Sequence, residues 1–321
     1  MDTPNQQWQA TYKFPRREYE VKHRTLYQYE FQVPLSYHYL HLQPRDWSAI
    51  QEVKDFRLSI APEPRDMVER EDFFGNQVQS FSIQEPHDEL EVTASFRASV
   101  MSNFPPIEDI TVTCSQVQRS LHRDTNFRSL QALQFIYPSS MIPYSSRIGE
   151  WASSFFGPKR SFLDGVLELS KTLKNEIEFD GSATEINTSV EEFFEVKKGV
   201  CQDFAHLMIA AIRSQDLPAR YVSGYILTFP REGEPRLEGA DASHAWVSVY
   251  IPGYGWIDID PTNDLIVSDQ HIRTAVGRDF NDVSPIKGSI TGGGEGALTV
   301  EVTVAPLDEE PPIAIQSQSQ S

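Results

Sequence analysis

The residue best suited to chemistry is Cys201, which follows Gly199 at the predicted start of a helix. Apolar spacing predicts this helix over residues 201–214, before Leu217 and Pro218 end it. A cysteine in the first turn lies among unpaired backbone N–H groups at the positive end of the helix dipole, and both favour the thiolate. We interpret Cys201 as a candidate nucleophile; the simpler alternative is a small buried hydrophobic residue.

A thiolate nucleophile needs a base and a group that orients the base. His244 opens one predicted strand and Asp260 closes the next, and the turn residues between them predict an antiparallel hairpin. We expect Tyr250 to pair with Trp256 across the turn. Asp260 then lies opposite Trp246 and diagonal to His244, within reach of the imidazole. The other face is apolar and consists of Ala245, Val247, Val249, Ile257 and Ile259.

Other assignments remain open for these residues. Asp258 shares the face of Asp260 and competes with it; it could also be a solvated surface charge, or form a metal pair with Asp260 and Asp264. His244 alone could be a strand histidine that only satisfies its hydrogen bonds. His206, five residues along the helix from Cys201, is interpreted as structural. We expect no bound metal and no cofactor.

Composition and charge exclude several classes of protein. The chain has 321 residues and a formal net charge of −18, which argues against binding to nucleic acid or to an anionic membrane. Its two cysteines can form neither a disulfide framework nor a CxxC zinc site. The first residues are polar and lack the apolar stretch of a signal peptide, so we expect a cytoplasmic location.

The periodicity predicts an α+β protein of two domains. Strand-like alternation predicts an antiparallel β-sandwich over residues 19–103, as in Leu90, Val92, Ala94 and Phe96. Helices and then strands predict a second, α+β domain, in which helices pack on an antiparallel sheet; this is the core, and it contains the candidate residues. The expected ranges are a flexible N-terminus at 1–18, a linker at 104–120, the core at 121–305 and a disordered tail at 306–321.

Four segments around these candidates resemble the motifs of bacterial transglutaminase-like proteins, which have a papain-like Cys-His-Asp arrangement. They are Gly199–Leu207, Arg220–Tyr225, Ser243–Val247 and Gly255–Asn263. The segments Asp72–Asn76 and Glu85–His87 resemble the N-terminal β domain of those proteins, and His271–Asp279 resembles the segment after their third catalytic residue. The resemblance covers about residues 19–304.

This resemblance implies Cys201 as the nucleophile, His244 as the base and then the acid, and Asp260 as the residue that orients the imidazole. It favours Asp260 over Asp258. The implied function is acyl transfer or hydrolysis of a peptide or glutamine-type amide through a thioester, with a protease or amidase preferred. The alternatives are a protein-crosslinking transglutaminase and a non-catalytic peptide-binding or adaptor module. We expect a peptide or protein substrate, and a protein partner for the N-terminal domain.

Overall fold

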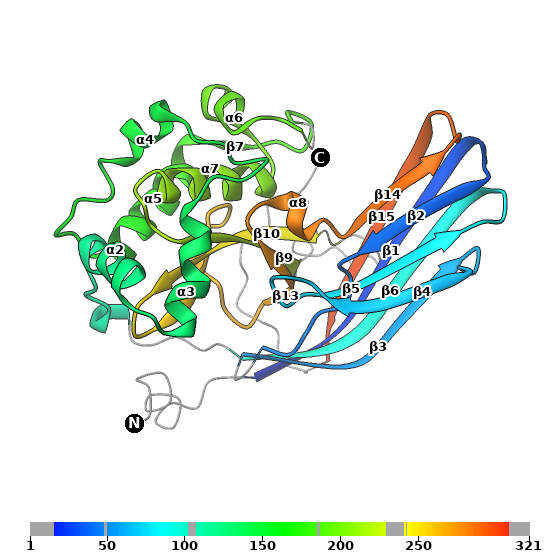
Figure 1. The fold of residues 1–321 in the computed structure, drawn as a ribbon, viewed down its shortest axis with the longest axis horizontal. Coiled ribbons are helices and arrows are strands. Elements are labelled where there is room, and N and C mark those ends of the chain that lie inside the picture. Colours follow the sequence, from blue (N-terminus) through cyan, green and yellow to red (C-terminus); the bar gives the residue numbers. More distant parts are fainter. Residues whose placement is uncertain are drawn as a thin grey trace, which may run out of the picture.

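The computed structural model describes residues 16–47, 50–101, 107–184, 187–228, 241 and 243–307. The predicted flexible N-terminus up to residue 15 and the predicted tail from residue 308 lie outside the described residues. The fold is α+β, as predicted: a β-sandwich stands beside a core of helices packed on an antiparallel sheet (Figure 1). Within the described ranges, no helix has the length and apolar character to span a membrane.

The sandwich consists of two four-stranded antiparallel sheets. The first has the order β15-β1-β6-β3, with bounds Gly296–Pro306, Arg16–Val33, His87–Met101 and Gln51–Ala61. The second has the order β14-β2-β5-β4, with bounds Ile286–Thr291, Leu35–Leu40, Gln77–Ile83 and Asp66–Glu71. Alternate residues of β6 are buried, including Leu90, Val92, Ala94 and Phe96, so the predicted period-2 pattern forms the inner face of the sheet.

The structure differs from the predicted domain ranges at three points. Strands β14 and β15 lie within the range 121–305 assigned to the core, yet they pair with β2 and β1 of the sandwich. Alternation in the sequence identifies a strand but not its partner, so it could not assign these strands to a sheet. Helix α2, Cys114–Arg123, begins inside the predicted linker at 104–120, and β1 begins at Arg16, before the predicted boundary at residue 19.

The core sheet has the order β12-β11-β10-β9-β13 and is antiparallel. Its strands span Leu265–Ile266, Gly255–Asp260, Ser243–Ile251, Ala219–Ile226 and His271–Gly277. The remaining helices are α3 Phe127–Leu133, α4 Ser146–Ala152, α5 Phe162–Glu176, α6 Val190–Val196, α7 Cys201–Arg213 and α8 Phe280–Val283. Short elements complete the core: η1 Ile107–Asp109, η2 Gln134–Ile136, β7 Glu178–Phe179 and β8 Lys198–Gly199.

Helix α7 packs on one face of the core sheet. The side chains predicted to form its buried face are all at most 1% exposed: Phe204, Leu207, Met208, Ala211 and Ile212. They share one apolar cluster with Ala219 of β9 and Val247 of β10. Burying this stripe holds the helix, and with it Cys201, against the sheet.

The sandwich covers the other face of the core sheet. Trp47 and Phe74 pack against the apolar cluster of Val222, Trp246, Val267 and Val276. Two side-chain amides of the sandwich bond to the backbone of β13. Gln51 accepts from the N–H of Arg273 at 2.8 Å and donates to its carbonyl at 2.9 Å. Asn76 likewise accepts from the N–H of Val276 at 2.9 Å and donates to its carbonyl at 2.8 Å. These amides thus form the backbone hydrogen bonds that a neighbouring strand would otherwise form with β13.

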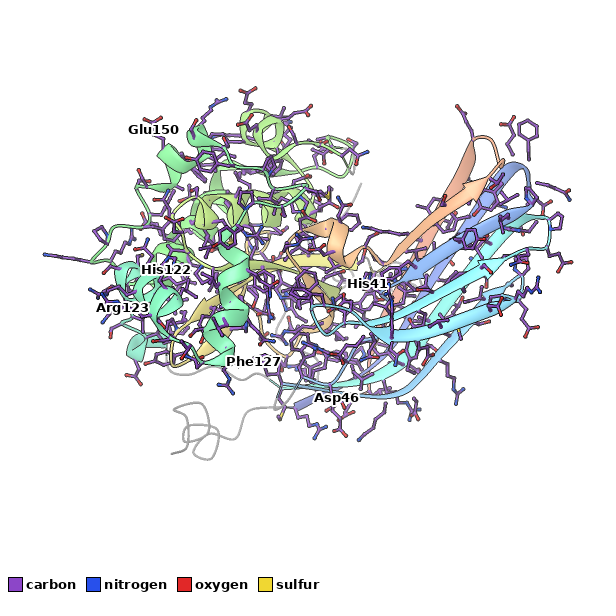
Figure 2. All side chains as sticks on the ribbon, in the orientation of Figure 1. His41, Asp46, His122, Arg123, Phe127 and Glu150 are labelled. Atoms are coloured by element: carbon purple, nitrogen blue, oxygen red, sulfur yellow. The ribbon has the colours of Figure 1, made fainter. Side chains whose placement is uncertain are left out.

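His41 adds a further link between the two parts of the chain. Figure 2 shows it at the junction of the sandwich with the segment that follows α8. Its Nδ1 donates to the carbonyl of Ser284 at 3.0 Å, and its backbone N–H donates to the carbonyl of Pro285 at 2.9 Å. The sandwich is therefore fixed to the core by both side-chain and backbone hydrogen bonds.

His206, predicted to be structural, lies in the core at 2% exposed and accepts a hydrogen bond from the N–H of Phe280 at 3.2 Å. Burial lowers its pKa to about 4. Below about pH 6.5 the imidazole is protonated in the unfolded chain but not in the folded protein. The folded protein therefore loses stability as the pH falls from about 6.5 toward 4, and the full stability is present above about pH 6.5.

The variant His206→Gln keeps an acceptor for the N–H of Phe280 but does not titrate. Between pH 7 and pH 5 the wild type should lose about 2 kcal/mol more unfolding free energy than the variant. Urea unfolding at both pH values measures the difference. Parallel losses in the two proteins would show that His206 does not carry this pH dependence.

Candidate active site

The hairpin of β10 and β11 has the predicted register. Tyr250 pairs with Trp256, and Val247 with Ile259. The predicted apolar set, Ala245, Val247, Val249, Ile257 and Ile259, belongs to the core cluster beneath α7. His244 and Asp260 therefore share the opposite face, because side chains alternate along a strand.

The structure brings His244 and Asp260 into direct contact. The Nε2 of His244 lies 2.7 Å from the Oδ2 of Asp260, and the two residues are 8% and 0% exposed. The side-chain amide of Asn263 donates to the same Oδ2 at 2.7 Å. The backbone N–H groups of Thr262 and Asn263 donate to Oδ1 at 3.0 and 3.2 Å. These bonds hold the carboxylate in one orientation.

Cys201 lies at the other side of the His244 ring. It is the first residue of α7, is partly buried, and lies close enough to His244 for its thiol to help raise the pKa of the imidazole. Since Nε2 faces Asp260, Nδ1 is the ring nitrogen that remains for the thiol. The imidazole thus joins Cys201 to Asp260, in the arrangement that a thiol nucleophile, its base and an orienting carboxylate require.

Glycine is required at position 199 to start this helix. A Cβ at Gly199 would lie 2.5 Å from the Oδ2 of Asp203 and 2.8 Å from the ring of Phe193. That Oδ2 accepts from the N–H of Val200 at 2.9 Å, and the Oγ1 of Thr184 donates to it at 2.7 Å. Any larger residue would displace the segment that leads into Cys201.

Electrostatics favour a charged imidazole at this position. Burial lowers the pKa of His244, but the charge of Asp260, the hydrogen bond to Asp260 and the nearby thiol of Cys201 outweigh it and raise the pKa to about 10. Burial raises the pKa of Asp260, but His244 and His271 lower it by more, so its pKa lies below the ordinary value. His244 is therefore an imidazolium and Asp260 a carboxylate at neutral pH.

His271 belongs to the site, although the sequence analysis gave it no role. Its Nε2 lies 3.1 Å from the Oδ2 of Asp260, and the ring is fully buried. Its pKa is lowered, mainly by burial, so the ring is neutral and its Nε2–H donates to the carboxylate. The resembling segment 271–279 contained the residue, but its contact depends on how β13 pairs with β9.

Among the described residues, one group could in principle hold a metal ion. It consists of His244, Asp260 and His271, whose possible ligand atoms all lie within 4.8 Å of one another. Both histidine Nε2 atoms already contact Oδ2 of the carboxylate. The two contacts to the carboxylate are therefore hydrogen bonds, and Nδ1 of His271 is buried without a partner among the described residues.

Asp258 is not a solvated charge, so that interpretation is wrong. It is 3% exposed, and its Oδ2 accepts from the indole N–H of Trp246 at 2.8 Å and from Nε of Arg273 at 2.7 Å. Its side chain is directed to these donors because the whole face is covered by the sandwich. Asp258 thus links the hairpin to β13 through Arg273, and Asp260 is the carboxylate bonded to His244.

Comparison with known proteins identifies the family. Residues 19–99 match the bacterial transglutaminase-like N-terminal region, and residues 150–261 match the transglutaminase-like superfamily. An uncharacterized protein of Mycobacterium tuberculosis is 34% identical over 296 residues, which cover 90% of this chain and 93% of the relative. The chain belongs to the transglutaminase-like superfamily, with the N-terminal region found in its bacterial members.

Two further proteins resemble the chain, one over a short segment and the other at low sequence identity. Over 81 residues, or 23% of this chain and 11% of the relative, the chain is 36% identical to the protein-glutamine gamma-glutamyltransferase of Pseudomonas aeruginosa. A solved structure described as a candidate cysteine protease of Cytophaga hutchinsonii has a TM-score of 0.75 at 20% identity, covering 95% of this chain and 96% of that chain. The second likeness shows that the two proteins share a fold.

The two thiols should differ strongly in reactivity. Cys114 is 1% exposed, and burial raises its pKa to about 11, whereas Cys201 is partly exposed beside an imidazolium. At pH 6, iodoacetamide should modify Cys201 at least about tenfold faster than Cys114, because the thiolate is the reactive form. Mass spectrometry of the modified peptides gives both rates. Equally slow labelling of the two residues would contradict an activated Cys201.

The contact between His271 and Asp260 can be tested with the same reaction. His271→Leu removes one hydrogen-bond donor to the buried carboxylate of Asp260. The lost bond stabilises the carboxylate by roughly 1.4 kcal/mol, which corresponds to a factor of ten in an equilibrium constant. The alkylation rate of Cys201 at pH 6 should fall by about that factor, and its pH profile should shift. His271→Gln retains an N–H donor and serves as the matched control. Unchanged pH profiles in both variants would leave His271 only a packing role.

Proposed function

We propose that this chain hydrolyses a peptide or glutamine-type amide through a thioester on Cys201. The observation that carries the proposal is the position of His244, which lies close to the thiol of Cys201 on one side and is hydrogen-bonded to Asp260 on the other. A high pKa on the imidazole and a fixed carboxylate behind it support a thiolate–imidazolium pair before substrate binds. Membership of the transglutaminase-like superfamily supports the same chemistry.

In the first half of the reaction, the thiolate of Cys201 attacks the carbonyl carbon and forms the C–S bond, leaving the negative charge on oxygen. The backbone N–H of Cys201, at the positive end of the α7 dipole, stabilises this oxyanion. His244 then gives its proton to the leaving nitrogen, the C–N bond breaks, and ammonia or an amine departs. Asp260 keeps the imidazole oriented and stabilises its charge.

In the second half, neutral His244 takes a proton from water as the oxygen attacks the thioester. The C–S bond breaks, the carboxylic acid leaves, and the thiolate–imidazolium pair is restored. Water needs no binding site of its own, whereas transfer to an amine requires a site for that amine. For this reason we propose hydrolysis as the primary activity.

Protein crosslinking is the second candidate. It is supported by the local identity with the protein-glutamine gamma-glutamyltransferase of Pseudomonas aeruginosa. In that reaction a primary amine replaces water in the second half, and an isopeptide bond replaces the free acid. The first half of the reaction, and the roles of Cys201, His244 and Asp260, are the same.

A panel of glutamine-containing peptides, incubated with and without a primary amine, tests both activities. Mass spectrometry should detect a cleaved or deamidated product for hydrolysis, or amine incorporation for transfer. Cys201→Ala should abolish either product, and Asp260→Asn should lower kcat/KM by on the order of 10³–10⁴-fold, because it removes the charge that orients and stabilises the imidazolium.

Cys114→Ser is the matched control and should retain the activity, since Cys114 is a buried residue of α2 with no role in the proposed reaction. The acyl group trapped on Cys201 would identify the donor substrate. Fast alkylation of Cys201 with no product from any peptide or amide would overturn the proposal and favour a non-catalytic peptide-binding module.

A further inference from the structure

A buried arginine without a partner lies between the sandwich and the core. Arg220 of β9 is 8% exposed, and no described residue forms a hydrogen bond or an ion pair with its guanidinium. The group lies 4.0 Å from the ring centroid of Trp256 and 5.5 Å from that of Trp47. These two indoles come from the core and the sandwich, so Arg220 is at the interface.

Burial of an unpaired guanidinium is unfavourable, because its N–H donors lose their water without gaining acceptors. Burial lowers the pKa of Arg220 to about 9; Asp258 opposes this shift, and Arg273 and Arg45 add to it. The group therefore still carries its charge at neutral pH. The neighbouring indoles stabilise that charge in part, but they satisfy no N–H in its plane.

Arg220 forms no ion pair with a described carboxylate, although the charge of Asp258 acts on it. Arg273 is paired with Asp258, whose Oδ2 also accepts from Trp246. Arg45 is influenced by Glu71 and Asp72. Arg220 therefore shares the charge of Asp258 with Arg273, which is the arginine in direct contact with that carboxylate.

The polar atoms left over here are mainly donors. Nε of Arg220, Nη1 of Arg273, Nε of Arg45 and Nε1 of Trp47 are all buried and without an acceptor among the described residues. The first three belong to arginines whose charges influence one another, and the fourth belongs to an indole that contacts two of them. A group of buried N–H donors beside an unpaired cation is complementary to an anion.

We propose that a small anion, a halide or a small oxyanion, binds at this interface and pairs with Arg220. It accepts hydrogen bonds from the N–H groups of Arg220, Arg273 and Trp47. Since Trp47 belongs to the sandwich and both arginines belong to the core, the bound anion joins the two domains. This proposal is independent of the activity at Cys201.

Iodide is a suitable probe because it both binds such sites and quenches indole fluorescence. The full chain is titrated with sodium iodide at constant sodium, and sodium gluconate, which has a bulky organic anion, replaces the iodide in the reference samples. The Tm should rise by roughly 3–6 °C along a saturable curve, as for any ligand that binds only the folded state. Indole fluorescence should fall along the same curve. Acrylamide, a neutral quencher, should show no saturation.

Arg220→Met removes the charge and keeps much of the volume, so both saturable responses should disappear. Arg147→Met is the matched control, because Arg147 also lies over an aromatic ring, 5.4 Å from Phe194, but at an exposed site. It should respond like the wild type. Should Arg220→Met fail to fold, Trp47→Phe removes one donor and should raise the half-saturating iodide concentration about tenfold, as read from the Tm.

The proposal is wrong if Arg220→Met or Trp47→Phe gives the same saturable curve as the wild type. It is also wrong if the wild-type Tm changes only linearly with iodide, which would mean that water alone satisfies these N–H groups.

Discussion

The constraint on which the site depends is the buried carboxylate of Asp260. A fully buried charge is tolerated only when hydrogen bonds and an opposite charge compensate its loss of water. Here the imidazoles of His244 and His271, the amide of Asn263 and the backbone after β11 all supply N–H donors. Because these donors come from β10, β13 and the turn after β11, the strands must keep their register for the carboxylate to be satisfied. The sheet and the site therefore stabilise each other.

The two faces of the core sheet are covered in different ways. Apolar side chains of α7 cover one face, and this burial positions Cys201. The other face carries Asp258, Arg220 and Arg273, and the sandwich covers it with the rings of Trp47 and Phe74 and with two side-chain amides that replace water. The polar face of the core sheet lies beneath the candidate active site and packs against the sandwich. The N-terminal domain is therefore part of the structure that supports the site.

The sequence predicted what depends on local pattern. The pairing of Tyr250 with Trp256 and the common face of His244 and Asp260 follow from a short turn and an apolar alternation, so both were predictable. His271 was not, because it reaches Asp260 through pairing of β13 with β9, with an irregularity between Arg273 and Ala275 that alternation does not reveal. The buried state of Asp258 depends on the sandwich, whose position no local pattern encodes.

The pairing of β14 and β15 with the sandwich has a consequence for synthesis. During translation the first domain leaves the ribosome with each sheet lacking one edge strand, since β14 and β15 complete them only at residues 286–306. Domains that are contiguous in sequence can fold as they emerge, but this one must wait for nearly the whole chain. Until then, the backbone groups along the edges of β1 and β2 are open to pairing with other strands, and the protein is most exposed to aggregation at that stage.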